Sequence, residues 1–174
     1  LSALSMVLVM YVRFPIIPSA AFMEYEPGDV PMLIAAFMYG PTAGLVMTII
    51  VSALQAFTVS AASGWVGLVM HIIATGTLVV VAGSIYKKYH TIKGAFAALA
   101  AGSICMTLVM IPSNLFFTVR FYGVPYDAVI AMLPTAILPF NLIKSFANSI
   151  IVLVVYKPLS RFLRGTQELQ RHTT

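Results

Sequence analysis

Charged residues are scarce in this sequence of 174 residues. Asp, Glu, Lys and Arg make up 9% of the chain and 60% of it is hydrophobic, whereas an average soluble domain is about 25% charged. Ten basic and five acidic side chains are too few to cover a soluble fold of this size, and the hydrophobicity excludes a disordered chain. The composition therefore predicts a membrane protein whose apolar outer surface faces lipid.

Cysteine is almost absent, and a phosphate-binding loop is missing. Cys105 is the single cysteine, which excludes an internal disulfide and a cysteine-based metal site. The sequence has no Gly-x-x-x-x-Gly-Lys-Ser/Thr motif, so we do not expect the chain to hydrolyse ATP by itself. Once spans of about 20 residues each are counted, no room is left for a soluble catalytic domain.

Residues 30–86 contain no Asp, Glu, Lys or Arg, and this stretch is long enough for two or three membrane spans. Turn-like breaks fall at Gly40-Pro41 and at residues 60–64. The loop before the stretch, 23–29, is acidic, and the loop after it, 86–93, is basic. The positive-inside rule puts the basic loop in the cytoplasm. With the acidic loop outside, an odd number of spans must join the two loops, and three fit.

The same alternation predicts an all-α bundle of six transmembrane helices in the cell membrane, with both termini cytoplasmic. Residues 1–164 form this single domain, and the polar residues 165–174 form a cytoplasmic tail. The apolar run starts at Leu1, so we expect the chain to begin inside its first span. We interpret the net charge of +5 as an orientation signal rather than a nucleic-acid-binding surface. The predicted helices cover about 1–14, 30–39, 41–59, 65–86, 94–118 and 133–157.

Polar side chains at membrane depth are the most informative residues of such a chain. Lys144 lies 13 residues before Lys157, about 20 Å from the inner interface at 1.5 Å per residue. Asn141 and Asn148 share its helix face, and Asn114 reaches a similar depth on the preceding helix. We therefore predict that Asn114, Asn141 and Lys144 bind a polar ligand in a pocket that opens outward.

A purely structural role for Lys144 stays open. The ammonium would then pair with an acidic residue of the outer loop, which is Glu24, Glu26 or Asp29. The asparagines would form interhelical hydrogen bonds worth about 0.6–2 kcal/mol each. Burying a lysine in lipid costs at least about 2.5 kcal/mol, which favours the ligand-binding role.

His71 lies near the middle of the predicted helix 65–86. A proton relay or a metal ligand is one interpretation, but no second histidine or cysteine stands nearby at ligand spacing. We favour a hydrogen-bonded packing residue and no metal site. An intramembrane serine hydrolase is disfavoured, because the sequence has no Gly-x-Ser-x-Gly motif and no obvious carboxylate within a span to orient His71.

Aromatic residues gather toward the predicted outer face, and Phe22, Tyr25, Trp65 and Tyr122 are among them. An interfacial aromatic belt explains part of this excess. Stacking on a flat ring of the ligand explains the rest.

Small residues in the first helices mark places where helices approach closely. They serve either internal packing or docking of another membrane protein, and both interpretations stay open. The residues are Ser2, Ala3, Ser5, Gly40, Ala43 and Gly44.

Two stretches near the N-terminus are Phe22-Met-Glu-Tyr-Glu-Pro-Gly-Asp-Val-Pro-Met-Leu-Ile-Ala and Phe37-Met-Tyr-Gly-Pro-Thr-Ala-Gly. They resemble the substrate-binding S components of energy-coupling factor (ECF) vitamin transporters. In the last predicted helix, Ile137-Leu-Pro-Phe-Asn-Leu-Ile-Lys144 is similar to the riboflavin-specific members. The resemblance covers nearly the whole chain.

The resemblance implies a six-helix fold that binds riboflavin near the outer surface, with the first outer loop, about 15–29, as a lid. It gives flavin contacts to Asn114, Asn141 and Lys144, and Phe140 in the same run is a further candidate. Riboflavin is then the transported ligand and no cofactor is expected. A coupling membrane subunit, which faces the small residues of the first helices, and two ATPase subunits are implied as partners.

Other functions stay possible at this point. An S component for thiamine, a pyridoxine-like compound or a queuosine precursor is the nearest alternative. A small intramembrane enzyme and a non-catalytic assembly factor belong to different classes.

Overall fold

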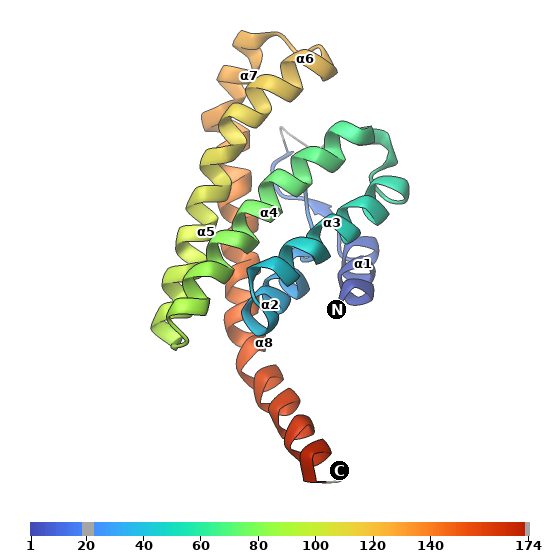
Figure 1. Ribbon diagram of the computed structural model, residues 1–174. Coiled ribbons are helices and arrows are strands. Elements are labelled where there is room, and N and C mark those ends of the chain that lie inside the picture. The colour runs from blue at the N-terminus through green and yellow to red at the C-terminus, as the bar shows by residue number, and fades with distance from the viewer. Residues whose placement is uncertain (19–22, 173–174) are drawn as a thin grey trace.

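The structure is a computed structural model that describes residues 1–18 and 23–172, with side chains described through Val155. Helices dominate it (Figure 1), and two strands of two residues each form a short antiparallel pair. The first half of the chain contains α1 (Ser2–Tyr11), β1 (Phe14–Pro15), β2 (Glu24–Tyr25), α2 (Asp29–Tyr39), α3 (Pro41–Phe57) and the 3-10 turn η2 (Ala61–Ser63). The second half contains α4 (Gly64–Lys88), α5 (Ile92–Ser113), η3 (Asn114–Thr118), α6 (Val119–Tyr122), α7 (Tyr126–Met132), η4 (Leu133–Ile137) and α8 (Leu138–His172).

Three helical stretches of the described chain are long and apolar enough to cross a membrane, namely Ala61–Lys88, Ile92–Tyr122 and Tyr126–Val155. The helices α1, α2 and α3 are shorter, with 10, 11 and 17 residues, against the roughly 20 residues of a full span. Helices therefore occupy all six predicted regions, but three of them reach the length that crosses a bilayer unaided.

The boundary between the last two long helices differs from the prediction. The predicted helices end at 118 and begin again at 133, which leaves residues 119–132 outside them. In the structure the helical stretch continues to Tyr122, the turn is confined to residues 123–125, and helix resumes at Tyr126 rather than 133. Charged residues fit the first and last turns of membrane helices, which reach the polar surface. Gly123 makes the short turn possible with a φ of 67°.

The predicted break at Gly40-Pro41 is confirmed. Gly40 adopts a φ of 96° between α2 and α3, a conformation that favours glycine. Pro41 opens α3 at its first position, where the missing N–H of proline costs no helical hydrogen bond. The short connection turns the chain back, so α3 packs beside α2.

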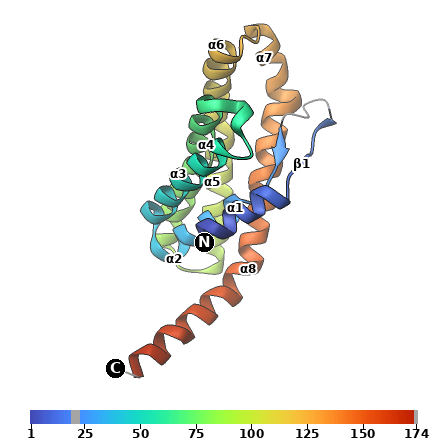
Figure 2. The same cartoon turned by 90° about the vertical axis from the view of Figure 1, so that its right-hand side faces the viewer.

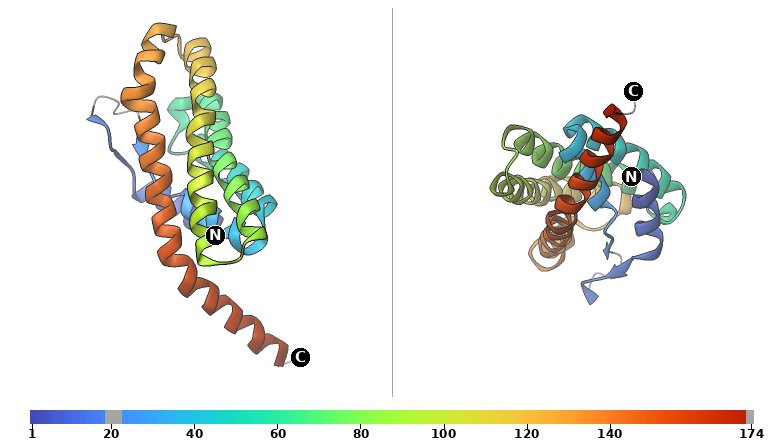
Figure 3. Two further views of the ribbon diagram at one scale, coloured as in Figure 1. Left: turned by 90° about the vertical axis from the view of Figure 1, so that its left-hand side faces the viewer. Right: turned by 90° about the horizontal axis from the view of Figure 1, so that it is seen from below.

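The long helices form a frame on which the short ones pack. The column formed by α7, η4 and α8 runs beside α5 (Figures 1 and 2), and α4 packs against both α5 and α3. The end of α8 projects beyond the bundle (Figure 3). Large apolar side chains point outward from α5 and α8, including Phe96, Leu108 and Val154, as lipid-facing helices require.

The helix α2 lies at the centre of this arrangement. Its residues from Asp29 to Phe37 are all buried, and it contacts α1, α3, α4 and α8. A helix that is apolar on every side has to be surrounded by protein or lipid. Here the neighbouring helices provide that surrounding, and they hold the N-terminus of α2 with Asp29 in the interior.

Two of the small residues for which packing and docking were both open are packed inside this chain. The Ser5 hydroxyl is fully buried and donates to the backbone oxygen of Gly28 at 2.9 Å. Gly44 is buried, and an added Cβ there would come within 2.7 Å of Ala36. Close contact between α2 and α3 therefore explains Gly44. Ser2, Gly40 and Ala43 are half-buried and Ala3 is exposed, so these four can still be reached from outside.

Candidate ligand-binding cavity

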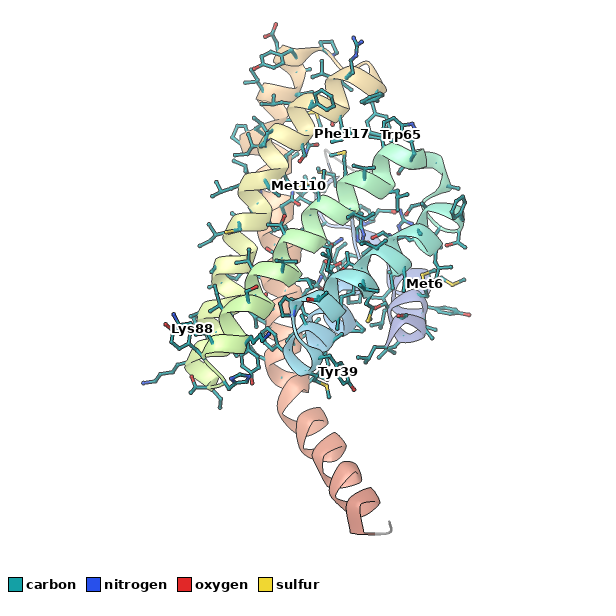
Figure 4. All side chains as sticks on the ribbon, in the orientation of Figure 1. Met6, Tyr39, Trp65, Lys88, Met110 and Phe117 are labelled. Carbon is teal, nitrogen blue, oxygen red and sulfur yellow. The ribbon has the colours of Figure 1, made fainter. Side chains whose placement is uncertain are left out.

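A cavity of about 650 Å³ lies between α3, α4, α5, the α7–α8 column and the segment before α2. Met110 of its wall lies between α4 and α5, toward the α6–α7 turn, whereas Lys88 marks the opposite end of the molecule (Figure 4). The volume falls in the range of about 300–1,000 Å³ that is typical of small-molecule sites. This cavity is the candidate functional site.

One part of the cavity wall is apolar and flexible. Methionines project into it from three elements, namely Met70 from α4, Met106 and Met110 from α5, and Met132 from α7. Unbranched thioether side chains adapt to the shape of a ligand and contact aromatic rings favourably. The wall therefore suits a large flat apolar surface.

Five of the predicted ligand-binding residues line this cavity: Asn114, Tyr122, Phe140, Asn141 and Lys144. They come from α5 to α8, so neighbouring helices bring them to one cavity. Their contact with a ligand stays a prediction, because the cavity geometry alone does not test it.

The other predicted aromatic residues lie elsewhere. Trp65 is 56% exposed and packs edge-on against Phe121, with ring centroids 4.8 Å apart. It lies at the start of α4, near Phe117 (Figure 4), and is not part of the cavity lining. Tyr25 is buried beneath the cavity, where its hydroxyl donates to Asn148 Oδ1 at 2.8 Å. Phe22 lies outside the described residues.

The two cavity asparagines stand beside irregular turns. Asn114 begins a π-helical turn that follows Pro112, and Asn141 follows a second one at Leu133–Ile137. Proline removes a helical hydrogen bond, and π-turns often mark functional sites. Each asparagine donates from Nδ2 to the carbonyl oxygen four residues earlier, at 2.8 Å. Each side chain is thus held in place by its own helix.

The floor of the cavity carries a charged cluster, which we define as Glu26, Asp29, His71 and Lys144. The Lys144 ammonium lies 3.3 Å from Glu26 Oε1 and 3.7 Å from Asp29 Oδ2. His71 Nε2 lies 3.5 Å from Glu26 Oε1 and 3.6 Å from Asp29 Oδ1. Two carboxylates therefore face the same two nitrogen-bearing side chains.

Neutral side chains complete the hydrogen bonding of these carboxylates. Gln55 Nε2 is 2.9 Å from both oxygens of Glu26. Thr75 donates to Asp29 Oδ1 at 3.0 Å, and Asn148 donates to Asp29 Oδ2 at 3.1 Å. Buried charges are tolerated when they are paired and hydrogen-bonded. These contacts anchor the segment before α2 to α3, α4 and α8.

Glu26 is ionised in this setting. Burial alone would raise the pKa of its carboxyl, but the Lys144 ammonium and the neighbouring His71 hold that pKa well below its usual range. The floor therefore contributes fixed charge to a cavity that is otherwise largely apolar.

The structural interpretation of Lys144, in which its ammonium pairs with an acidic residue, is confirmed in part. Lys144 pairs with Glu26 and Asp29, whereas Glu24 pairs with Arg13 instead. Lys144 nevertheless also borders the cavity, so pairing and ligand contact do not exclude each other.

His71 has carboxylate neighbours that the sequence interpretation missed, because Glu26 comes from the loop before α2 and Asp29 is the first residue of α2. Gln55 was missed as well. A signal was present in the spacing: Ser52 and Gln55 lie three residues apart on α3, and His71 and Thr75 lie four apart on α4. Polar pairs at helical spacing in apolar helices indicate one shared polar face.

Arg13 lines the cavity and links neighbouring segments of the chain. Its guanidinium pairs with Glu24 and donates to the backbone oxygen of Val59 at 2.8 Å. This contact joins the end of α1 and the short β1–β2 pair to the α3–α4 connection. Within residues 1–18 and 23–172, no group of three or more His, Cys, Asp or Glu residues has an arrangement that could hold a metal ion.

Comparisons with known proteins agree with this architecture. The profile of the family described as "ECF transporter, substrate-specific component" matches residues 1–156. The riboflavin transporter RibU of Staphylococcus aureus is 30% identical over 170 residues, which cover 94% of this chain and 88% of that protein. The riboflavin transporter FmnP of Bacillus subtilis is 26% identical and covers 99% of this chain and 94% of its own length.

A solved structure supports the same relationship. It is described as the S component of a bacterial ECF transporter, and it superimposes with a TM-score of 0.79 at 29% identity. The match covers 93% of this chain and 92% of the solved one. The members of this family are transport components, which agrees with the expectation that the chain is a transport subunit and not an enzyme. The chain belongs to the family of substrate-specific components of ECF transporters.

Proposed function

We propose that this protein captures riboflavin from outside the cell for uptake by an ECF transporter. The observation that carries the proposal is the cavity, in which a methionine-rich wall faces two carboxamides and an ammonium. Its relatives are named riboflavin transporters, and that name agrees with the chemistry of the cavity.

The flavin ring is flat, with one apolar edge and one edge of carbonyl and N–H groups. Its apolar part fits against the methionines and stacks on Tyr122 and Phe140. Its polar groups are bound by Asn114, Asn141 and Lys144, whose amide and ammonium groups donate hydrogen bonds. The flavin is cargo, and no resident cofactor is part of the proposal.

The protein lies in the cell membrane as a multi-pass bundle with the cavity facing outward. The α4–α5 turn, which carries Lys87, Lys88 and Lys93, and the projecting end of α8 are at the same end of the molecule (Figure 1). The cavity is nearer the other end. The positive-inside rule orients the basic end to the cytoplasm, and both termini are assigned there with six membrane-inserted helices.

Energy for release of the ligand comes from partners. A coupling membrane subunit and two ATPase subunits drive uptake, because this chain contains no phosphate-binding loop. The coupling subunit contacts the accessible small residues of α1 and α3, which are Ser2, Ala3, Gly40 and Ala43. Nucleic acid is not a partner.

Flavin fluorescence tests this function directly. Purified protein in detergent is titrated into riboflavin, and binding should quench the fluorescence in a saturable manner. Thiamine and pyridoxine serve as competitors. Competition by one of these, without any quenching of flavin, would assign the protein to another vitamin. Lys144→Ala should weaken riboflavin binding at least tenfold, because it removes the ammonium that faces the ligand.

A further inference from the structure

The charged cluster is one positive charge short of balance if His71 is neutral. Glu26 and Asp29 supply two negative charges, and Lys144 supplies one positive charge. The side chains of all three are at most 7% exposed, so water does not screen the difference. A buried unpaired charge is strongly unfavourable, and His71 is the remaining titratable group in contact with both carboxylates.

The contacts of His71 fix one of its two ring protons. Nε2 faces Glu26 Oε1 and Asp29 Oδ1, which can only accept hydrogen bonds. The Thr75 hydroxyl is 3.4 Å from Nε2 and already donates to Asp29. Nε2 therefore carries a proton. Nδ1 lies 2.7 Å from Ser52 Oγ, a hydroxyl that can accept as well as donate, so a second proton at Nδ1 finds an acceptor.

We propose that His71 is a positioning residue in its doubly protonated form, and that its charge holds Glu26 and Asp29 when Lys144 turns to the ligand. Lys144 and His71 share the oxygen Glu26 Oε1, at 3.3 and 3.5 Å. When the ligand engages the ammonium, the imidazolium keeps one cation beside each carboxylate. Without that charge, Lys144 stays committed to the carboxylates and the affinity for the ligand falls.

Three charged groups face His71 in the described part of the chain. They are Glu26 before α2, Asp29 at the start of α2 and Lys144 on α8. The helix α3 contributes the neutral Ser52, and α4 contributes Thr75. Tyr25 lies one contact further away, on Asn148. A proton on His71 therefore changes a cluster with no other group that titrates near neutral pH.

The sign of the pH dependence follows from this charge count. The protonated form of His71 is the form that binds, so riboflavin affinity is highest at low pH and falls as the pH rises and His71 loses its proton. We expect a decrease of about tenfold or more between about pH 6 and pH 9, within the usual range of coupling between linked sites. The inference rests on the proposed binding of riboflavin through Lys144.

The experiment measures the riboflavin dissociation constant by fluorescence quenching over this pH range for four proteins. The wild type should show the step. His71→Gln should bind weakly at every pH without a step, and His71→Lys, with a permanent charge, should bind tightly without a step. His90→Gln is the matched control, since His90 lies exposed in the α4–α5 connection, and it should behave as the wild type.

Several results would overturn the proposal. A flat wild-type profile, or a step that persists in His71→Gln, removes His71 from the coupling. If His71→Gln does not fold, the imidazole ¹⁵N shifts of the empty protein decide, because the chain has three histidines and replacing His90 and His172 isolates the signal. A neutral His71 at pH 6 contradicts the proposal. Absence of riboflavin binding at every pH refutes the proposed function instead, and the ¹⁵N measurement still reports on the charge of His71.

Discussion

The charged cluster and the cavity asparagines meet at the same cavity, which Glu26, His71 and Lys144 of the cluster line, but they are held in different ways. Each member of the cluster contacts side chains from other elements: Glu26 is bound by Gln55 of α3 and Lys144 of α8. Asn114 and Asn141 donate to carbonyl oxygens of their own helices. One group joins distant parts of the chain, and the other is prepared locally.

This difference separates residues that stabilise the fold from residues that mainly bind the ligand. Removing one member of the cluster leaves an opposite charge buried without a partner. Removing an asparagine side chain leaves no charge unpaired; at Asn114 the carbonyl oxygen of Met110 keeps its backbone N–H donor. We therefore expect the cluster to control both stability and binding, and the asparagines to control mainly binding.

The largest effect is expected at Asp29. Asp29→Ala leaves Lys144 and His71 with one carboxylate between them and removes the acceptor of Thr75 and Asn148. The free energy of unfolding should fall by about 3–5 kcal/mol, as for other broken buried ion pairs. Thermal unfolding in detergent measures the change. Glu24→Ala is the control, because Glu24 is one-third exposed and surface pairs contribute about 0–1 kcal/mol. Equal losses of stability in Asp29→Ala and Glu24→Ala would contradict the distinction between the buried cluster and a surface ion pair.

A double substitution divides the two roles of Lys144. Lys144→Met alone should lower both the unfolding temperature and the riboflavin affinity, because Glu26 and Asp29 lose a cation. Adding Glu26→Gln removes one negative charge, so the unfolding temperature should recover while the affinity stays low. Unfolding curves and flavin titrations on the same preparations check this. Recovery of both properties would show that Lys144 does not contact the ligand.

The sequence predicted the parts of the molecule that depend on local pattern. Missing charge over residues 30–86 and the break at Gly40-Pro41 are properties of neighbouring residues, and they located the helices. Helical spacing and depth likewise brought Asn114, Asn141 and Lys144 to one cavity. The ends of the long helices are predicted less accurately: the predicted helices stop at 118 and resume at 133, whereas the structure is helical to Tyr122 and again from Tyr126.

Features that need distant contacts were not predictable. The carboxylate partners of His71 lie more than 40 residues away, Glu26 before α2 and Asp29 at its start, and no local pattern joins them. The burial of Gly44 depends on how closely α2 approaches α3. Trp65 shows the same limit: the direction in which its side chain points depends on the rotation of α4, which no local pattern sets.

An intermediate effect is expected for two asparagines of α8, Asn141 and Asn148. Asn141→Ala should weaken riboflavin binding about tenfold, the typical loss for one missing hydrogen bond at a buried group, with little change in unfolding temperature. Asn148→Ala, two turns further along α8, should lower the unfolding temperature, because Asn148 contacts Tyr25, Glu26 and Asp29. The two variants remove the same chemical group. A loss of affinity in Asn141→Ala and a loss of stability in Asn148→Ala would support the distinction between the two groups of residues. Identical effects of the two substitutions would contradict it.

The smallest effect is expected at Trp65, which lies outside both groups. Its side chain is exposed, packs against Phe121 and does not line the cavity. Trp65→Leu should therefore change the riboflavin affinity less than about twofold, since the substitution removes no ligand contact. Tyr122→Leu is the matched aromatic control, because Tyr122 lines the cavity and its loss removes a stacking partner worth about 0.5–1.5 kcal/mol. Flavin fluorescence measures both variants without relying on the tryptophan signal. A large effect at Trp65 would mean that the loaded protein folds the outer end of α4 over the ligand.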